Sequence, residues 1–562
     1  MKSGPSEYER RSERERVAFR ACLRGAEDLQ QKVLRETIAE NAGSAFGEEH
    51  GFAGLDTEAK FRARIPIRTY DELSPWIERA AAGESRVLTE VDPAVFLTSS
   101  GSTGDSKRVP MTPPYVQRSF MPFFFAALGN TLRYCPHSID TPDSTLNMKW
   151  DPLRSHGATS AGLPAMGASQ VDFAKRFGQE LASEPGTRAE SAMIPSAIAD
   201  EIERIYYRVR IGAEHDVRAL IGINPSMVVT LPALLERFWE RLVRELHDGT
   251  VMGEKRREPL PARARELDAM ARYFGQRLPA LLWPNLELVF CWTGGAAKIY
   301  TDEIRRAFGD RVQILPAPLA ASEAPVAVPI DRHPTAGVLF VSGAYYEFID
   351  ADRAIAPDAK TRRWNEVEVG EELHVVVSHV GGLYRYALGD VVRVVDLVDG
   401  VPRLEYACRH RSARVGEANV REGTIVLAAL SALRGAGLTA RGFVACADAA
   451  PRRIGVAVEL ATERPAAGDD EAFAERVDRS LSAASQAYRA ARAAGALDLP
   501  QVVWMARGTL ADDWVARVHT GVRPTQVKDR IFVTKDDWSR LTKGAVSLIG
   551  GAPGPDLLGS SS

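Results

Sequence analysis

The chain has 562 residues, of which 45% are apolar and 26% are charged, a composition typical of a globular protein with more than one domain. Its formal charge of −3 and its isoelectric point near 6.4 argue against a dedicated binder of nucleic acid or of anionic membranes, because such binding needs clustered basic charge. We therefore expect small-molecule substrates, no nucleic-acid or membrane partner, and a cytoplasmic location.

Helical patterns dominate the first half of the chain. Residues 6–45 combine helix formers with spaced apolar side chains, which predicts one or two amphipathic helices. The apolar stretch FMPFFFAAL at 120–128 contains Pro122 and is too short to span a bilayer. The segment 140–170 is rich in Pro, Gly, Ser and Thr, which predicts a loop. Further helices are predicted at 197–211, 231–247 and 262–278.

Strand patterns become frequent in the second half. LELVFCW at 286–292 and residues 312–315 are each predicted to form a strand that enters a loop containing Gly or Pro. Such junctions are where open α/β sheets place ligands. Residues 337–408 consist of strand patterns separated by Gly-Gly at 381 and Asp-Gly at 399, which predicts an antiparallel meander or small barrel.

Alternating patterns beyond Arg409 predict an α+β module. Its elements are a helix at 423–434, strands at 442–447 and 454–460, a helix at 471–494 and a strand at 502–505. The predicted fold class is α/β, with a large N-terminal α/β domain that carries a β-barrel-like part, and a smaller α+β C-terminal domain. The predicted bounds are 1–408 for the first domain, with 337–408 as its β-rich part, 409–550 for the second, and 551–562 for a disordered tail.

The five cysteines are far apart and odd in number, without a C-x-x-C pair, which favours buried thiols in a reducing compartment. They are Cys22, Cys135, Cys291, Cys408 and Cys446. The histidines show no spacing typical of metal ligands, and His374 and His379 are expected to be ordinary strand and turn residues.

The stretch TSSGSTGDSKRVP at 98–110 has the composition of a phosphate-binding loop. Glycines let backbone N–H groups turn inward, hydroxyls add donors, and Lys107 adds positive charge. It is not a Walker loop, because that motif needs Gly and Lys side by side before Ser or Thr, whereas this chain has Ser106, Lys107 and Arg108. A different nucleotide-binding architecture is therefore indicated.

Four segments, taken in their order along the chain, indicate which nucleotide-binding architecture this is. They are TSSGSTGDSK (98–107), LAASE (319–323), LYRYALGD (383–390) and QVK (526–528). Together they resemble the adenylate-forming superfamily and, within it, the auxin-responsive Gretchen Hagen acyl acid amido synthetases. FRARIPIRTYDEL, LWPNLELVFCWTGG and YYEFID are similar to that family too. The resemblance extends from about Gln30 to Arg530.

The resemblance implies a reaction and a set of site residues. Family members use ATP to activate a carboxylic acid as an acyl-adenylate and then pass the acyl group to the amine of an amino acid. Glu323 would coordinate Mg²⁺, Asp390 would accept hydrogen bonds from the ribose, and Arg409 would lie at the hinge of the C-terminal domain. Ala321 and Ser322 would line the adenine and α-phosphate site. The residues implied to wrap the ATP phosphates are Ser99, Ser100, Gly101, Ser102, Thr103 and Gly104, followed by Lys107.

The chemistry independently favours these residue types. A carboxylate that attacks an α-phosphate meets a negatively charged centre, so catalysis needs charge neutralisation and alignment. A carboxylate such as Glu323 suits Mg²⁺, a hard ion, and an aspartate suits a diol because it only accepts hydrogen bonds.

The chain departs from the family pattern at two points. Many relatives have a lysine just after the hinge, where this chain reads GEANV and places Ala418 or Val420. Beyond Arg409 only Lys528, Lys535 and Lys543 remain, and Lys528 is the candidate for the mobile catalytic lysine. Leu319 stands where the wider superfamily often has an aromatic residue, so the adenine must stack elsewhere.

Several interpretations stay open at this point. Trp292, Thr293 and Gly294 could line the acyl pocket, although a core role for the tryptophan is about as plausible. Tyr384 and Tyr386 are expected to pack inside the β-rich part. Alternative functions are an acid–thiol ligase that uses coenzyme A or a carrier protein, and a non-catalytic nucleotide sensor.

Overall fold

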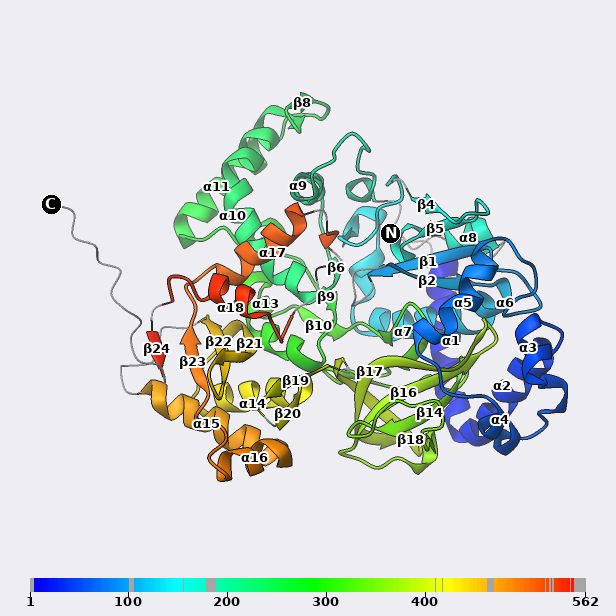
Figure 1. The fold of residues 1–562 in the computed structure, drawn as a ribbon. Helices are drawn as coiled ribbons and strands as arrows, with labels where there is room; N and C mark the ends of the chain where they lie inside the picture. Colours follow the sequence, from blue (N-terminus) through cyan, green and yellow to red (C-terminus); the bar gives the residue numbers. More distant parts are fainter. Residues whose placement is uncertain are drawn as a thin grey trace. The chain divides into compact units, whose positions relative to one another are not determined.

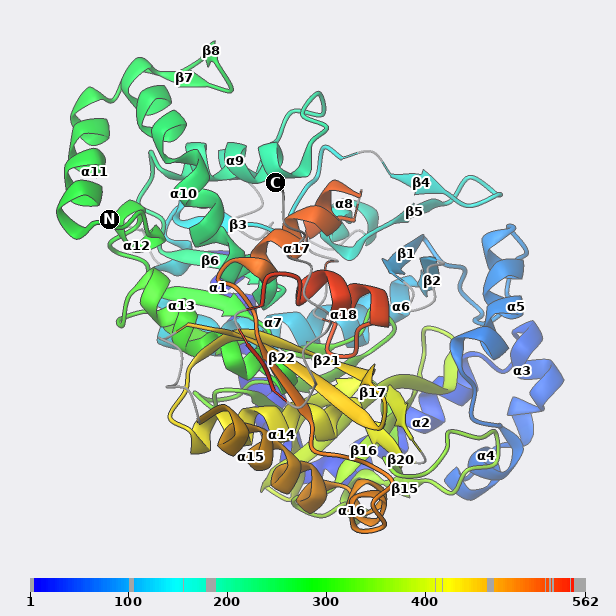
Figure 2. The same ribbon diagram turned by 60° about the vertical axis from the view of Figure 1, so that its left-hand side comes forward.

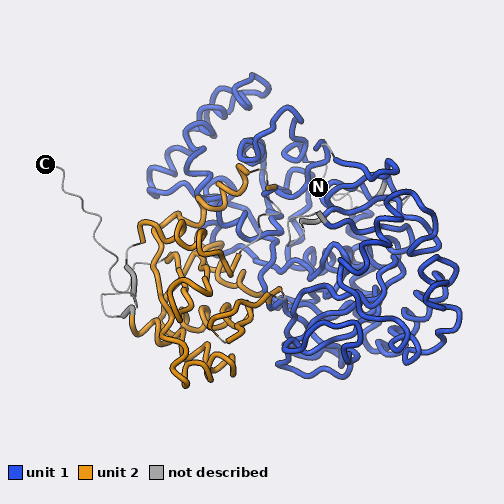
Figure 3. The backbone as a smooth tube through the Cα atoms, in the orientation of Figure 1, with its two compact units in different colours: residues 1–294, 307–407, 523–526 blue, residues 295–306, 408–522, 527–562 orange. Residues whose placement is uncertain are grey.

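The computed structural model describes residues 5–100, 106–154, 156–177, 189–409, 411–416, 418–461, 469–520, 522–524, 527, 530–545 and 547–549. The chain divides into two compact units. Unit 1 comprises residues 1–294, 307–407 and 523–526, and unit 2 comprises residues 295–306, 408–522 and 527–562 (Figure 3). Throughout the described part, the structure contains no helix that is both long and apolar enough to cross a bilayer.

Unit 1 begins with the predicted amphipathic helices, α1 (Glu7–Cys22) and α2 (Ala26–Glu40). A capping box starts α1, because the Ser6 hydroxyl accepts the Glu9 N–H and the Glu9 carboxylate accepts the Ser6 N–H. Leu34 and Ile38 are buried, which gives α2 its core-facing side. The short helices that follow are α3 (Ala45–His50), α4 (Glu58–Arg64) and α5 (Tyr70–Ala81).

The candidate phosphate loop joins two strands of a hairpin. Strand β1 (Val95–Ser100) pairs antiparallel with β2 (Ser106–Met111), and the last register pair is Ser100 with Ser106. Residues 101–105, at the tip of this hairpin, lie outside the described residues. After a one-turn helix, α6 (Pro113–Tyr115), residues Val116–Phe120 form a π-helix, and the chain continues as α7 (Met121–Tyr134), with Pro122 in its first turn.

A parallel four-stranded sheet has the order β10-β9-β6-β3. Its strands are β3 (Thr145–Asn147), β6 (Ala219–Ile223), β9 (Leu288–Cys291) and β10 (Gln313–Pro316), of which β9 and β10 confirm two predicted strands. The predicted helices are confirmed as α9 (Glu201–Gly212), α10 (Pro225–Asp248) and α11 (Pro261–Phe274). Figure 2 shows α10 and α11 lying side by side.

An eight-stranded antiparallel sheet accounts for the predicted β-rich part, with the order β11-β12-β13-β18-β17-β16-β14-β15 (Figure 1). Asp399 and Gly400 connect β17 to β18 with φ values of 49° and 83°, the conformation of a tight hairpin turn. The strands are β11 (Leu319–Ala320), β12 (Pro325–Val328), β13 (Ala336–Leu339), β14 (Tyr345–Asp350), β15 (Arg362–Arg363), β16 (Glu372–His379), β17 (Leu383–Val398) and β18 (Val401–Arg409).

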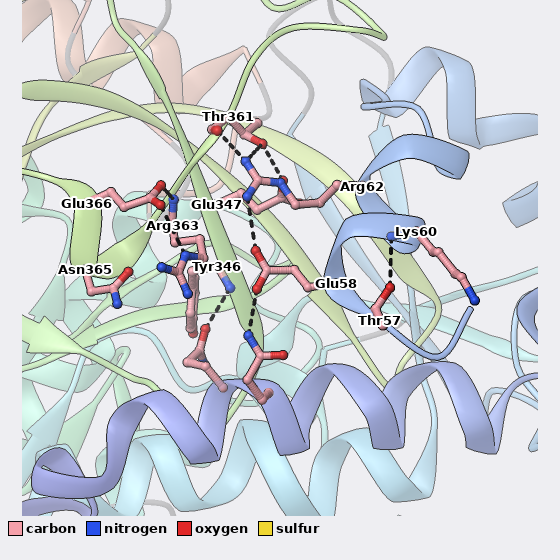
Figure 4. A network of polar contacts seen from close by, with 12 residues as sticks. Thr57, Glu58, Lys60, Arg62, Tyr346, Glu347, Thr361, Arg363, Asn365 and Glu366 are labelled. Atoms are coloured by element: carbon pink, nitrogen blue, oxygen red, sulfur yellow. Dashed lines mark hydrogen bonds and ion pairs between the residues drawn. The ribbon is translucent and has the colours of Figure 1, made fainter. Parts of the chain in front are cut away.

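Polar contacts fasten the N-terminal helices to this sheet (Figure 4). The Gln30 side-chain oxygen accepts the backbone N–H of Tyr346 at 3.0 Å. Arg62 of α4 pairs with the buried Glu347 of β14 at 3.2 Å and with Glu58 at 3.1 Å. Helix α4 is therefore held at a defined place against the sheet.

Unit 2 contains an α+β sheet with the order β21-β22-β23-β24. Its strands are β21 (Ala440–Ala450), β22 (Arg453–Leu460), β23 (Gln501–Trp504) and β24 (Ser547–Ile549). A hairpin of β19 (Ser412–Val415) and β20 (Ala418–Arg421) precedes them. The helices of this unit include α14 (Glu422–Gly435), α15 (Asp469–Ala484), α16 (Gln486–Ala493), α17 (Thr509–His519) and α18 (Lys535–Leu541).

Two predictions about elements are wrong. Residues 140–170 are not only loop, since they contain β3, β4 (Gly157–Ala158) and β5 (Pro164–Met166), which are too short to show a strand period. The predicted helix at 471–494 is two helices, because Ser485 adopts extended backbone angles and caps α16 by accepting the Tyr488 N–H. The predicted tail, 551–562, lies outside the described residues.

Candidate functional site

Glu323 lies in the tight turn that joins β11 to β12, at the edge of the eight-stranded sheet. The turn is closed by the Ala321 N–H, which donates to the Ala324 carbonyl at 3.0 Å. Ala321 and Ser322, the expected nucleotide-site residues, are half-buried in the same turn, whereas Glu323 is only 8% exposed. A buried carboxylate needs partners, since its charge is costly away from water.

Three buried side chains contact Glu323, one at its carboxylate and two at its backbone carbonyl. The Tyr386 hydroxyl of β17 donates to Oε1 of Glu323 at 3.2 Å. The Glu323 backbone carbonyl accepts the Tyr115 hydroxyl at 3.3 Å and lies 3.0 Å from Nε2 of His379. Both ends of Glu323, the main chain and the carboxylate, are therefore held by groups from other elements.

Lys107 of β2 also reaches Glu323. Its Nζ lies 3.9 Å from Oε1 of the carboxylate and 5.0 Å from the centre of the Tyr70 ring. In the hairpin register, Lys107 is opposite Ser99, at the start of the candidate phosphate loop. The structure thus brings together Lys107 and Glu323, two predicted site residues that are far apart in the sequence.

Asp390 follows on the same strand as Tyr386, next to Gly389, whose φ is 77°. Burial raises the pKa of the Tyr386 hydroxyl well above its ordinary value, and the charges of Glu323 and Asp390 add to this rise. Asp390 lies four residues beyond Tyr386 on the same strand. Its assignment to the ribose stays a prediction.

His379 is electrically neutral at ordinary pH, because complete burial lowers the pKa of its imidazole to about 4. The Gly381 N–H donates to Nδ1 of His379 at 3.1 Å, so the ring proton is on Nε2 and donates to the Glu323 carbonyl. The ring also stacks on Tyr115, with 4.2 Å between the ring centres.

Glu323 is the one residue that the sequence analysis predicts to bind a metal ion. In the described part of the chain, no group of three or more His, Cys, Asp or Glu side chains is arranged to hold a metal ion. Mg²⁺ does not require such a group when a nucleotide is present, because it binds through one or two carboxylates, phosphate oxygens and water. An anionic oxygen donor beside a lysine therefore fits Mg²⁺ bound together with phosphates.

The three candidate pocket residues contact other parts of unit 1. The Trp292 N–H donates to the Ile223 carbonyl at 2.8 Å, and the Thr293 hydroxyl donates to the Pro334 carbonyl at 2.6 Å. Gly294 packs closely against Tyr406. Their role in the acyl pocket stays a prediction.

The remaining predicted residues belong to the C-terminal part. Arg409 is the last residue of β18, just after the division between the two units at 407 and 408. Ala418 and Val420, where relatives have a lysine, are buried in the β19–β20 hairpin. Lys528 and the loop residues Gly101, Ser102, Thr103 and Gly104 lie outside the described residues, and the side chains of Ser99 and Ser100 are not described either.

Sequence reasoning missed the roles of Tyr115, His379 and Tyr386 around Glu323. His379 was expected to be an ordinary turn residue, and Tyr386 was expected to pack, which it does at 1% exposure. The available signal was chemical: a buried tyrosine hydroxyl or imidazole needs a hydrogen-bond partner. The sequence did not indicate which partner that would be.

Comparisons with known proteins show which family the chain resembles. Three family models match: the GH3 family N-terminal domain at residues 16–314, the GH3 family central domain at 337–409 and the GH3 family C-terminal domain at 424–537. A protein of Oryza sativa subsp. japonica named probable indole-3-acetic acid-amido synthetase GH3.12 is 30% identical over 438 residues, which cover 70% of each chain.

Two further proteins with names of the same kind are similar to this chain. A jasmonoyl-L-amino acid synthetase of Nicotiana attenuata, JAR6, is 24% identical over 441 residues, covering 73% of this chain and 74% of its own. The solved structure of GH3.15 acyl acid amido synthetase superimposes with a TM-score of 0.76 at 18% identity, over 93% of this chain and 94% of that one. This structural likeness shows that the two chains share a fold.

Proposed function

The chain belongs to the GH3 family and is an amide-forming ligase, and on that premise we propose that it uses ATP to join a small carboxylic acid to the amine of an amino acid or a related amine. In the first step, the acid carboxylate displaces pyrophosphate from the α-phosphate and forms an acyl-adenylate. In the second step, the amine attacks the acyl carbon and AMP leaves.

The described residues supply charge neutralisation and alignment for the first step. Lys107 carries the positive charge at the end of the phosphate loop and neutralises charge on the phosphates. Glu323 would hold Mg²⁺, which would supply positive charge to the phosphate oxygens. Asp390 accepts the ribose hydroxyls, and its negative charge orients a neutral diol without a competing donor.

The observation that carries this proposal is that side chains from separate elements meet at the Glu323 carboxylate. Lys107 and Glu323 lie 3.9 Å apart although they come from different sheets, and Tyr386, between Glu323 and Asp390 in sequence order, contacts the same carboxylate oxygen. A lysine and a carboxylate beside a Ser/Thr/Gly loop are the groups that a metal-bound triphosphate needs.

A cytoplasmic location is part of the same proposal. None of the five cysteines forms a disulfide, and four of them are buried. Burial raises the pKa of the thiols of Cys135 and Cys291 to about 12, which disfavours the reactive thiolate. Buried thiols without disulfides suit a reducing compartment.

The test is pyrophosphate exchange into ATP that depends on an added carboxylic acid. We expect the wild-type chain to catalyse this exchange with some member of a panel of aromatic and aliphatic acids. Crossing the panel with the common amino acids, with mass spectrometry of the products, identifies the acid and the amine. Glu323→Gln is expected to lower the exchange rate about 100-fold, because it removes one charge from the metal site.

Other outcomes of this experiment contradict the proposal in different ways. Acid-dependent exchange that leads to a coenzyme A thioester, and not to an amide, would make the protein an acid–thiol ligase. ATP binding without exchange for any acid would make it a nucleotide sensor. Glu323→Gln with unchanged exchange at every Mg²⁺ concentration would refute the metal-ligand assignment.

A further inference from the structure

The contacts of Glu323 are unequal at its two carboxylate oxygens. The Tyr386 hydroxyl donates to Oε1 at 3.2 Å, and the Lys107 ammonium lies nearest the same oxygen at 3.9 Å. Among the residues that the structure describes, none donates a hydrogen bond to Oε2. Within the described part of the chain, the protein contacts of this carboxylate therefore fall on Oε1.

The main chain of Glu323 is fixed as well. Its carbonyl accepts hydrogen bonds from the Tyr115 hydroxyl and from Nε2–H of His379, which uses both lone pairs of that oxygen. Tyr115 and His379 support each other by stacking, at an angle of 18° between the rings. A backbone held at the residue itself limits the directions in which the side chain can point.

We propose that Tyr386, His379 and Tyr115 are positioning residues that orient the Glu323 carboxylate so that its Oε2 would be presented to the divalent cation. This inference rests on the proposed function, since it concerns the same metal–nucleotide site. Neighbouring groups that hydrogen-bond a metal ligand in this way typically change metal affinity by about 10- to 100-fold when removed.

The three positioning groups share a property that suits this task. Two tyrosine hydroxyls and one imidazole N–H each donate a hydrogen bond to Glu323, and all three come from other elements of the fold. Lys107 is the charged neighbour of the carboxylate, and at 3.9 Å it makes a longer contact than the Tyr386 hydroxyl. The uncharged donors therefore orient the ligand.

Tyr384 provides a matched control for Tyr386. Both tyrosines lie on β17, both are at most 1% exposed, and each hydroxyl makes one hydrogen bond. The Tyr384 hydroxyl donates to the Leu88 carbonyl at 2.6 Å instead of to Glu323. Tyr386→Phe and Tyr384→Phe therefore remove the same atom from similar surroundings, and only the first affects Glu323.

The experiment measures binding of ATP to the full chain with and without Mn²⁺, by calorimetry and by electron paramagnetic resonance of the bound Mn²⁺. We expect Tyr386→Phe to weaken Mn²⁺ binding in the ATP complex at least 10-fold while leaving the affinity for ATP in EDTA unchanged. Tyr384→Phe is expected to bind Mn²⁺ like the wild type. A general loss of structure would lower the affinity for ATP in EDTA too, so the two effects are distinguishable.

His379 gives a second, independent test that does not depend on the folding of the tyrosine variant. His379→Gln keeps an N–H donor near the position of Nε2 and is expected to retain most Mn²⁺ affinity, whereas His379→Leu loses it. Equal Mn²⁺ affinity in Tyr386→Phe and Tyr384→Phe, or in the two His379 variants, would overturn the inference. Failure of the wild-type chain to bind Mn²⁺ with ATP would instead overturn the proposed function.

Discussion

At the scale of single residues, Lys107 is held by two neighbours from other elements. Its Nζ lies 3.9 Å from Oε1 of Glu323 and 5.0 Å from the centre of the Tyr70 ring. The Tyr70 hydroxyl accepts the Arg108 N–H at 2.7 Å, which keeps the ring beside β2. The position of the Lys107 charge is therefore set by groups that are distant in the sequence.

Replacing Lys107 by methionine tests its role in the first step. The variant keeps the length of the side chain but loses its charge, so we expect acid-dependent pyrophosphate exchange to fall by about 100-fold or more. Lys149→Met, a change of the same type on a partly buried lysine, is the control and should leave exchange near the wild-type rate. Exchange that survives Lys107→Met would show that another cation neutralises the phosphates.

At the scale of secondary-structure elements, strand β17 positions Tyr386 through its neighbour Arg385. Arg385 has a φ of 47°, an uncommon conformation for a residue with a side chain, and the pairing of β16 with β17 is irregular nearby. Its guanidinium is buried and pairs with both carboxylate oxygens of Glu347, at 2.9 and 3.0 Å. This ion pair stabilises the irregular strand. Arg62 also pairs with Glu347, at 3.2 Å (Figure 4).

The prediction at this scale concerns stability. Arg385→Met leaves the buried Glu347 carboxylate poorly compensated, and we expect a loss of about 3–5 kcal/mol in the free energy of unfolding of unit 1. Arg363→Met, which removes partly exposed ion pairs with Glu27 and Glu366, should cost about 1 kcal/mol or less. Urea unfolding followed by tryptophan fluorescence measures both, and similar losses in the two variants would contradict the argument.

Adding Glu347→Leu to Arg385→Met provides a further check. If the loss comes from an uncompensated buried charge, removing that charge should recover part of the stability. If the loss comes from the unusual backbone of Arg385 alone, the double variant should be no more stable than the single one.

At the scale of the whole molecule, the division of the chain suggests how two chemical steps use one site. The chain passes from one compact unit to the other at several points. One of these points lies between residues 407 and 408, next to Arg409. We propose that the C-terminal unit turns near Arg409 after adenylation, because Lys528 serves the first step and must leave the path of the amine in the second.

Lys528→Ala is expected to abolish most acid-dependent pyrophosphate exchange. The same variant should still form amide when supplied with synthetic acyl-adenylate and amine, since the second step does not need that lysine. Lys543→Ala, a change of the same type in unit 2, is the control for both measurements. Intact exchange in Lys528→Ala would show that Lys528 is not the cation of the first step.

Much of the fold could be predicted from local patterns in the sequence. Helices α10 and α14 and strands β9 and β22 were identified because their apolar residues repeat with the period of the element. Strand β3 was missed because three residues are too few to show a period. The break at Ser485 was missed because alanine-rich sequence on both sides favours helix, and only the cap interrupts it.

The sequence by itself determined the family, the regular elements and the identity of Lys107 and Glu323 as candidates, because motifs and periods are properties of neighbouring residues. Only the tertiary structure decided which groups hold Glu323. Tyr115, His379 and Tyr386 are 208, 56 and 63 residues away from it along the chain. No local pattern encodes such contacts, since they arise when separate elements pack and their buried polar groups must find hydrogen-bond partners.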